Sequence, residues 1–153
     1  MSLFRLTNKF FSPLAILMVC GLLFSCSTSE IALKPPQATA DLPYRIEIVY
    51  FHRTDQCECM QKIEDNIRET IDSSFQQELD SGKLKYTSIA SDDWANGALV
   101  AKYNTGLFGL FIVIIKDNKE TIVPVDEIWT MTGDETTYKE YMKDIVTQYL
   151  AAE

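Results

Sequence analysis

The sequence predicts an α/β domain with a mixed four-stranded sheet and helices on both of its faces. Runs of β-branched and aromatic residues alternate along the chain with segments whose apolar residues recur every three or four positions. This alternation favours parallel pairing of the strands. The tight turn at 117–120 joins two strands directly, so it implies one antiparallel hairpin.

Strands are predicted at 45–51, 84–90, 109–116 and 121–125. The third is the most apolar segment after the N-terminal region, which predicts a buried central strand, with Ile112 and Ile114 in the core. Pro124 lacks an N–H group, so the fourth strand is expected at an edge of the sheet.

Helices are predicted after the first, second and fourth strands. The first carries an apolar stripe and ends at Asp80-Ser81-Gly82; the stripe consists of Met60, Ile63, Ile67, Ile71, Phe75 and Leu79. The second follows the N-cap-like segment 91–93 and is weakened by Asn96-Gly97. The last is expected to open with a capping box formed by Thr132 and Glu135.

Length and composition limit the class of protein. The 153 residues suit one domain, and 46% hydrophobic with 24% charged residues is ordinary for a soluble globular protein. These values exclude an intrinsically disordered chain and a membrane protein with several spans. The formal net charge of −8 and the lack of a basic cluster exclude nucleic acid as an expected partner.

The N-terminus has the features of an export signal. Arg5 and Lys9 form a positive n-region, and the apolar stretch 10–24 is too short to span a bilayer comfortably. A small residue then precedes Cys26, which resembles the lipobox of bacterial lipoproteins. The resemblance implies a signal peptide over 1–25, a lipid on Cys26, and an extracytoplasmic protein of the cell envelope; an uncleaved N-terminal anchor is the alternative.

Residues 26–43 are expected to form an extended linker. Pro35 and Pro36 lie in this segment, and no apolar periodicity runs through it. The linker would hold the domain, residues 44–153, away from the membrane surface. Loss of the two basic residues of the signal would change the net charge from −8 to −10.

Cysteine usage points to redox chemistry. Cys20 would leave with the signal and Cys26 would carry lipid, which leaves Cys57 and Cys59 as the thiols of an exported chain. A disulfide across one residue closes a small ring and constrains the unfolded chain weakly, so an exchange function is favoured over a structural one. We expect Cys57 to attack and Cys59 to resolve the mixed disulfide, without a cofactor.

The predicted order β-α-β-α-β-β-α matches the thioredoxin fold. Segment 51–60 would then lie at the carboxyl end of the first strand, where open α/β sheets tend to carry function. Asp55 and Glu58 resemble a capping box, which would place Cys57 in the first helical turn, where the helix dipole favours a thiolate. Leu110 occupies the position at which thioredoxins have a cis-proline.

Residues 44 to 151 resemble a thioredoxin-like family known as the ArsF family, or nitrophenyl compound nitroreductase subunit ArsF family. Members are similar small exported proteins with a strand that ends in Phe-His, a Cys-x-x-Cys motif and an Ile-Glu pair on the helix. The chain has Phe51-His52, Cys57 and Ile63-Glu64 at these places. It departs at the second cysteine, because Met60 falls at the family position and the thiol stands one residue earlier.

Two further functions stay open. His52, Cys57, Cys59 and Met60 together offer imidazole, thiolate and thioether groups, which suit Cu(I) or a thiophilic metalloid. The second open function is that of a non-catalytic scaffold, which would dock to another envelope protein. The expected partner is accordingly a redox protein or a metal-handling protein of the envelope.

The lipoprotein interpretation predicts that the mature chain begins at Cys26 and partitions into a detergent phase. Cys26→Ser should leave the precursor uncleaved, as seen by gel mobility and intact mass. A soluble product with a different N-terminus would contradict the interpretation.

Overall fold

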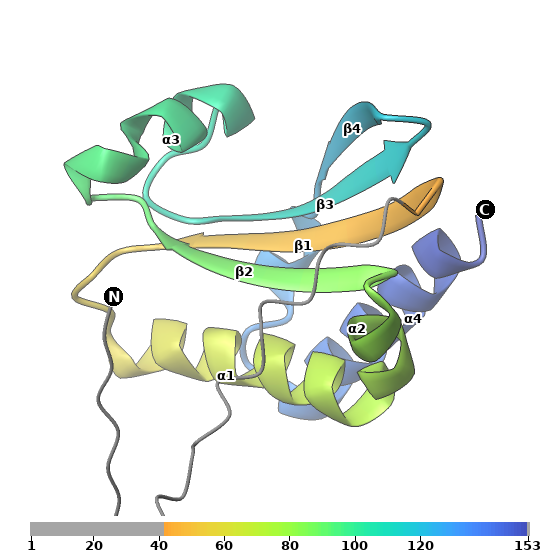
Figure 1. Ribbon diagram of the computed structural model, residues 1–153. Coiled ribbons are helices and arrows are strands. Elements are labelled where there is room, and N and C mark those ends of the chain that lie inside the picture. Colours follow the sequence, from red (N-terminus) through yellow and green to blue (C-terminus); the bar gives the residue numbers. More distant parts are fainter. Residues whose placement is uncertain (1–41, 153) are drawn as a thin grey trace, which may run out of the picture. The chain divides into compact units, whose positions relative to one another are not determined.

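A four-stranded sheet forms the centre of the structure, a computed structural model that describes residues 42–152 (Figure 1). The strands are β1 (Tyr44–His52), β2 (Leu84–Ala90), β3 (Gly109–Lys116) and β4 (Lys119–Pro124), in the spatial order β2-β1-β3-β4. β3 is an inner strand and β4 an edge strand, as predicted. The expected signal peptide, Cys26 and nearly all of the expected linker lie outside the described residues.

The strand directions make the sheet mixed. β1 pairs with β2 in parallel, and β3 pairs with both β1 and β4 in antiparallel fashion. The predicted hairpin is confirmed, but the antiparallel pairing of β3 with β1 was not predicted. Its cause is the length of the connecting helix: α3 (Gly97–Tyr103) has 7 residues and spans about 10 Å, whereas β3, with 8 residues, spans about 26 Å. The chain therefore re-enters the sheet at the end where it left.

Helices cover both faces of the sheet, which confirms the predicted thioredoxin-like α/β fold (Figure 1). α1 (Glu58–Ser74), α2 (Gln76–Ser81) and α4 (Glu135–Leu150) lie on one face. The 3-10 turn η1 (Trp94–Asn96) and α3 lie on the other. A second 3-10 turn, η2 (Glu127–Thr130), joins β4 to α4.

The alternation of side chains along β1 divides the core into two clusters. Ile46, Ile48 and Tyr50 pack with the first and last helices, whereas Val49 and Phe51 pack on the α3 side. On that second side the rings of Phe51, Tyr103 and Phe111 contact one another, with centroids 5.1–5.8 Å apart. Both faces of β1 are thus buried, and β1 leads into residues 53–57, which we call the cysteine loop.

Two predicted helix boundaries differ from the structure. The apolar stripe continues as predicted, but Phe75 leaves helical geometry and divides the segment into α1 and α2. The last helix is capped by Asp134, whose carboxylate accepts hydrogen bonds from the backbone N–H groups of Thr136 and Thr137. Thr132 is therefore not the cap: the residue directly before the helix is Asp134, and its carboxylate accepts from the unpaired N–H groups of the first turn.

The hairpin turn follows from the chemistry of its two central residues. Asp117 and Asn118 both have positive φ, 50° and 61°. A two-residue hairpin needs this left-handed backbone at both positions, and aspartate and asparagine tolerate it better than most other residues. The turn thereby fixes the register of β4 against β3.

The two isoleucines expected in the core of β3 differ in burial. Ile112 is fully buried, at 0% exposure, whereas Ile114 is only half-buried and packs at the margin of the α1 cluster. The expectation of full burial was therefore wrong for Ile114, which lies closer to the hairpin end of the strand.

We predict that Ile112→Ala lowers the free energy of unfolding by about 2–5 kcal/mol, because it leaves a cavity in a packed core. Ile114→Ala should cost clearly less, since part of its side chain stays in water in the native state. Urea denaturation of the two variants beside the parent chain measures the difference. Equal costs would contradict this assignment of the core.

Candidate functional site

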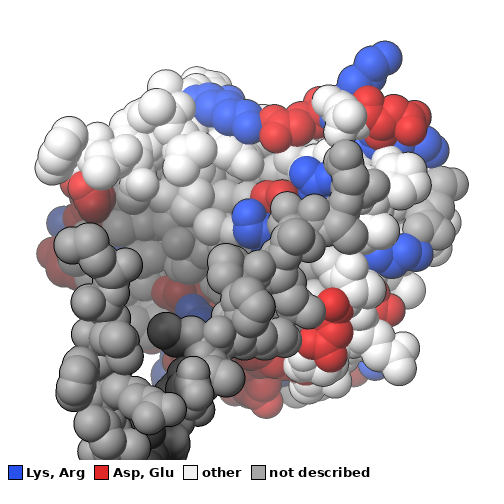
Figure 2. Space-filling view, in the orientation of Figure 1, with Lys and Arg blue, Asp and Glu red and all other residues white. Residues whose placement is uncertain are grey.

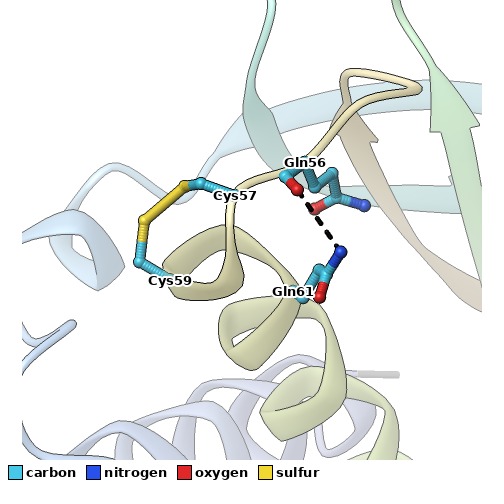
Figure 3. Close-up of a disulfide and its surroundings, with 4 residues drawn as sticks. All are labelled: Gln56, Cys57, Cys59 and Gln61. Carbon is cyan, nitrogen blue, oxygen red and sulfur yellow. Dashed lines mark hydrogen bonds between the residues drawn. A yellow bond between two sulfur atoms is a disulfide. The ribbon is translucent and has the colours of Figure 1, made fainter.

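The two cysteines predicted to act together form a disulfide at the start of α1 (Figure 3). The Cα atoms of Cys57 and Cys59 are 5.4 Å apart, and both residues are exposed. The disulfide lies on the opposite side of the loop from the side chain of Gln56 (Figure 3). It is therefore open to a reactant from solvent while the preceding residue is anchored to the protein.

Cys57 itself is the N-cap of α1. Its backbone is extended, with φ −72° and ψ 161°, and its carbonyl oxygen accepts from the N–H groups of Met60 and Gln61, both at 3.0 Å. The predicted capping box is thus wrong. The carboxylate of Asp55 instead pairs with the guanidinium of Arg53 at 2.9 Å, which directs it away from the helix. Cys57 stands just before the first turn, and Cys59 lies within it.

The cysteine loop is tied to the segment that follows β2. The backbone N–H and the hydroxyl of Thr54 both donate to Oδ1 of Asp92, at 2.8 and 2.9 Å. These hydrogen bonds, the backbone one first, lower the pKa of Asp92 below its usual value. The N–H of Ser91 also donates to the carbonyl of His52 at 2.7 Å. The loops that follow β1 and β2 are therefore hydrogen-bonded to each other at the carboxyl ends of these strands.

Glu64 is the centre of a hydrogen-bond network beneath the loop. Gln56 Nε2 donates to its Oε2 at 2.7 Å, and Ser88 Oγ and Arg68 Nη2 donate to its Oε1 at 2.8 and 3.2 Å. Burial raises the pKa of Glu64, but the hydrogen bonds from Gln56 and Ser88, followed by the charge of His52 and the hydrogen bond from Arg68, outweigh burial and lower it. The carboxylate is therefore held in its ionised form.

This network was not predicted as part of the site. The residues come from the loop, α1 and β2, and no sequence spacing connects Gln56 with Ser88. The only signal was the Ile-Glu pair in the family resemblance, which includes Glu64 but assigns it no role. The network links the residue directly before Cys57 to the body of the fold.

His52 and Met60 have contacts of their own. His52 Nδ1 lies 2.7 Å from the carbonyl oxygen of Arg53 and 3.0 Å from Gln56 Nε2, and its ring stacks on Tyr50 with centroids 5.9 Å apart. Met60 packs against the core beside α1. Within residues 42–152, no group of three His, Cys, Asp or Glu side chains gathers in a way that could hold a metal ion. Of the four candidate ligands, the structure joins Cys57 and Cys59 directly.

Three tyrosines surround the inner side of the network. Tyr50 and Tyr138 are fully buried, and Tyr86 is partly buried. Burial, followed by the charge of Glu64, raises the pKa of Tyr86 to about 12 and that of Tyr50 further. Burial likewise raises the pKa of Tyr138. All three phenols are neutral at physiological pH, so Glu64 carries the negative charge of this region.

Comparison with models of known protein families gives no match, and comparison with functionally characterised proteins gives none either. No helix in the part of the chain that the structure describes is both long and apolar enough to cross a bilayer.

We predict that Glu64→Gln lowers the free energy of unfolding by about 1–3 kcal/mol at pH 7. The NH2 group of the new amide would face Gln56, Ser88 or Arg68, which are themselves hydrogen-bond donors, so at least one donor would lose its acceptor. The folded-state pKa of Glu64 is depressed, so its contribution is complete above the unfolded value of about 4.3 and is lost as pH falls through the folded value. The difference in the free energy of unfolding between parent and variant should therefore shrink below about pH 4. Denaturation at several pH values measures it.

Glu140→Gln, an exposed carboxylate on α4, is the matched control and should leave stability nearly unchanged. A Glu64→Gln variant as stable as the control would show that the network does not hold the loop.

Proposed function

We propose that the protein is a membrane-tethered, thioredoxin-like protein that carries out thiol–disulfide exchange through Cys57 and Cys59 in the cell envelope. The observation that carries the proposal is the exposed disulfide at the N-terminus of α1, at the carboxyl end of β1. A disulfide in that position is accessible to a thiol from outside, and the helix start stabilises the thiolate that its opening releases.

The proposed reaction is an exchange of one sulfur–sulfur bond for another. A thiolate of the partner attacks the sulfur of Cys57, the bond to Cys59 breaks, and Cys59 leaves as a thiolate that takes up a proton. A second partner thiolate then attacks the mixed disulfide and releases Cys57. Two electrons pass to the protein, whose disulfide is reduced, and the two partner thiols become a disulfide. The reverse sequence oxidises the protein.

The rigid setting of the loop supports this proposal. Gln56 is held by Glu64, and Thr54 is held by Asp92, so the residues on the N-terminal side of the pair are fixed to α1 and to the β2–η1 connection. The sulfurs can then open and close without displacing the loop. Fixed geometry favours a reversible reaction, since little ordering is needed when the disulfide re-forms.

The tether and the family are parts of the same proposal. The lipobox-like segment at Cys26 supports an envelope lipoprotein, and the exposed Cys57–Cys59 pair supports another envelope redox protein as its partner. Phe51-His52, Cys57 and Ile63-Glu64 support membership of the ArsF family, with a Cys-x-Cys pair in place of the usual spacing.

We predict a reduction potential above about −230 mV for the Cys57–Cys59 couple, because a ring closed across one residue is strained and a helix start favours the thiolate. Equilibration of the protein in glutathione buffers, followed by alkylation and intact-mass counting of thiols, measures it. Glu58→Gln should raise the potential further, since the carboxylate between the cysteines opposes the thiolates. Glu140→Gln should leave it unchanged.

The Cys59→Ser variant should accumulate a mixed disulfide with glutathione on Cys57. A potential below about −300 mV, in the range of structural disulfides, would refute the exchange function. Thiols that stay reduced in air and bind Cu(I) stoichiometrically would favour the soft-metal alternative instead.

A further inference from the structure

We propose that the exposed ring of Trp94, with the carboxylates beside it, is the docking point for a basic, apolar segment of the protein that exchanges disulfides with Cys57 and Cys59. We call this region the Trp94 surface; it consists of Asp92, Asp93, Trp94, Leu99 and Leu107. The inference deepens the exchange function proposed above and rests on it.

The first argument is the exposure of apolar side chains. Among residues 42–152 the large exposed hydrophobic residues are Trp94 at 92%, Leu99 at 38% and Leu107 at 49%. All three come from one stretch of chain, and the hydroxyl of Ser91 donates to the carbonyl of Leu107 at 2.8 Å, which brings the two ends of that stretch together. An exposed apolar group of this kind gains free energy when a partner covers it.

The second argument is that the backbone under Trp94 is held in place. The carboxylate of Asp93 accepts from the N–H of Ala95 at 2.9 Å, and Asn96 Nδ2 donates to the carbonyl of Ala90 at 2.8 Å. An aromatic ring on a fixed turn loses little conformational freedom on binding, which suits an anchor for a partner.

The third argument is the closeness of this surface to the disulfide. Thr54 is bonded to Asp92 and precedes Cys57 by three residues, a span of at most about 11 Å. Trp94 follows Asp92 by two residues, at most about 7 Å. The N-terminal end of α1 and the η1–α3 segment lie at the same end of the sheet, on its two opposite faces (Figure 1). The two spans add to at most about 18 Å, a distance that an extended segment of about six residues can cover around the end of the sheet.

The fourth argument is charge, which indicates what kind of partner segment binds at the Trp94 surface. Segments 53–60 and 91–107 contain four carboxylates, those of Asp55, Glu58, Asp92 and Asp93, against two cations, Arg53 and Lys102. Lys102 is already paired with the carboxylate of Glu120 at 2.6 Å. Figure 2 shows a largely uncharged surface over η1 and α3, at the upper left, with acidic atoms at its left edge and basic and acidic atoms at its right edge. A lysine or arginine of a partner would be attracted to this region and would stack favourably on the tryptophan face.

The same charge argument weighs against two other occupants. A second copy of this chain would bring the same carboxylates face to face, and a membrane with anionic headgroups would repel them. The cationic, apolar segment is the occupant that satisfies both the ring and the carboxylates.

The test uses the full chain and two synthetic peptides, Lys-Leu-Lys-Cys-Leu-Lys and its counterpart with Glu at each Lys. Reduction of the protein disulfide by each peptide and by glutathione is followed by quenched-flow alkylation. We expect the basic peptide to react at least roughly tenfold faster than the acidic one at low salt, with the difference collapsing at high salt.

Trp94→Ala should slow the basic peptide roughly fivefold and leave the reaction with glutathione within about twofold of the parent. Trp94→Phe should restore most of the rate, because it keeps an aromatic face. Asp93→Asn, whose amide oxygen can still cap Ala95, should slow the basic peptide, while Glu140→Gln should not. Equal rates for the two peptides, or an equal loss of rate with glutathione, would overturn the proposal.

Docking and exchange can fail separately. If the parent protein does not react with glutathione, the exchange function fails. Docking is then decided by calorimetric titration with the basic peptide carrying Ser in place of Cys. Binding that Trp94→Ala abolishes supports the docking point, and no binding overturns it. Self-association, or binding to phosphatidylcholine vesicles, that depends on Trp94 would assign the surface to another occupant and would also overturn the proposal.

Discussion

Burial of β1 on both of its faces is the constraint on which the rest of the structure depends. The strand is hydrogen-bonded to β2 on one side and to β3 on the other, and its alternating side chains fill both core clusters. With a hydrogen-bonded strand on each side and a packed core on each face, β1 fixes the positions of the elements around it. Its carboxyl end therefore determines where the cysteine loop emerges, and five residues, 53–57, separate this end from the first helix.

The Glu64 network extends that constraint into the loop. A half-buried carboxylate has to be compensated, and here hydrogen bonds from Gln56 and Ser88 provide most of the compensation. One donor comes from the loop and the other from β2, so the hydrogen bonds to this one carboxylate connect the loop, β2 and α1. The loop that leads to Cys57 is thus held in place by a carboxylate of α1.

The parts of the fold that depend on local pattern could be predicted from the sequence, and those that depend on competition between groups could not. The β2 and β3 segments were predicted with the bounds that the structure has, because apolar runs bounded by turn residues specify strands. Caps were assigned wrongly at Asp55 and Thr132, because several nearby side chains compete for the same N–H groups. The antiparallel direction of β3 depends on the length of α3, and the partners of Glu64 depend on the finished fold.

The composition of the edge strand β4 has a consequence for the behaviour of the chain in a crowded compartment. An open edge is a template on which another polypeptide can add a strand and begin aggregation. β4 begins with Lys119 and Glu120 and ends with Pro124, which has no N–H to offer, so only Ile122 and Val123 provide a short apolar stretch between these residues. Addition of a foreign strand is therefore opposed at both ends of β4, so this edge of the sheet is a poor template for the association of unfolded chains.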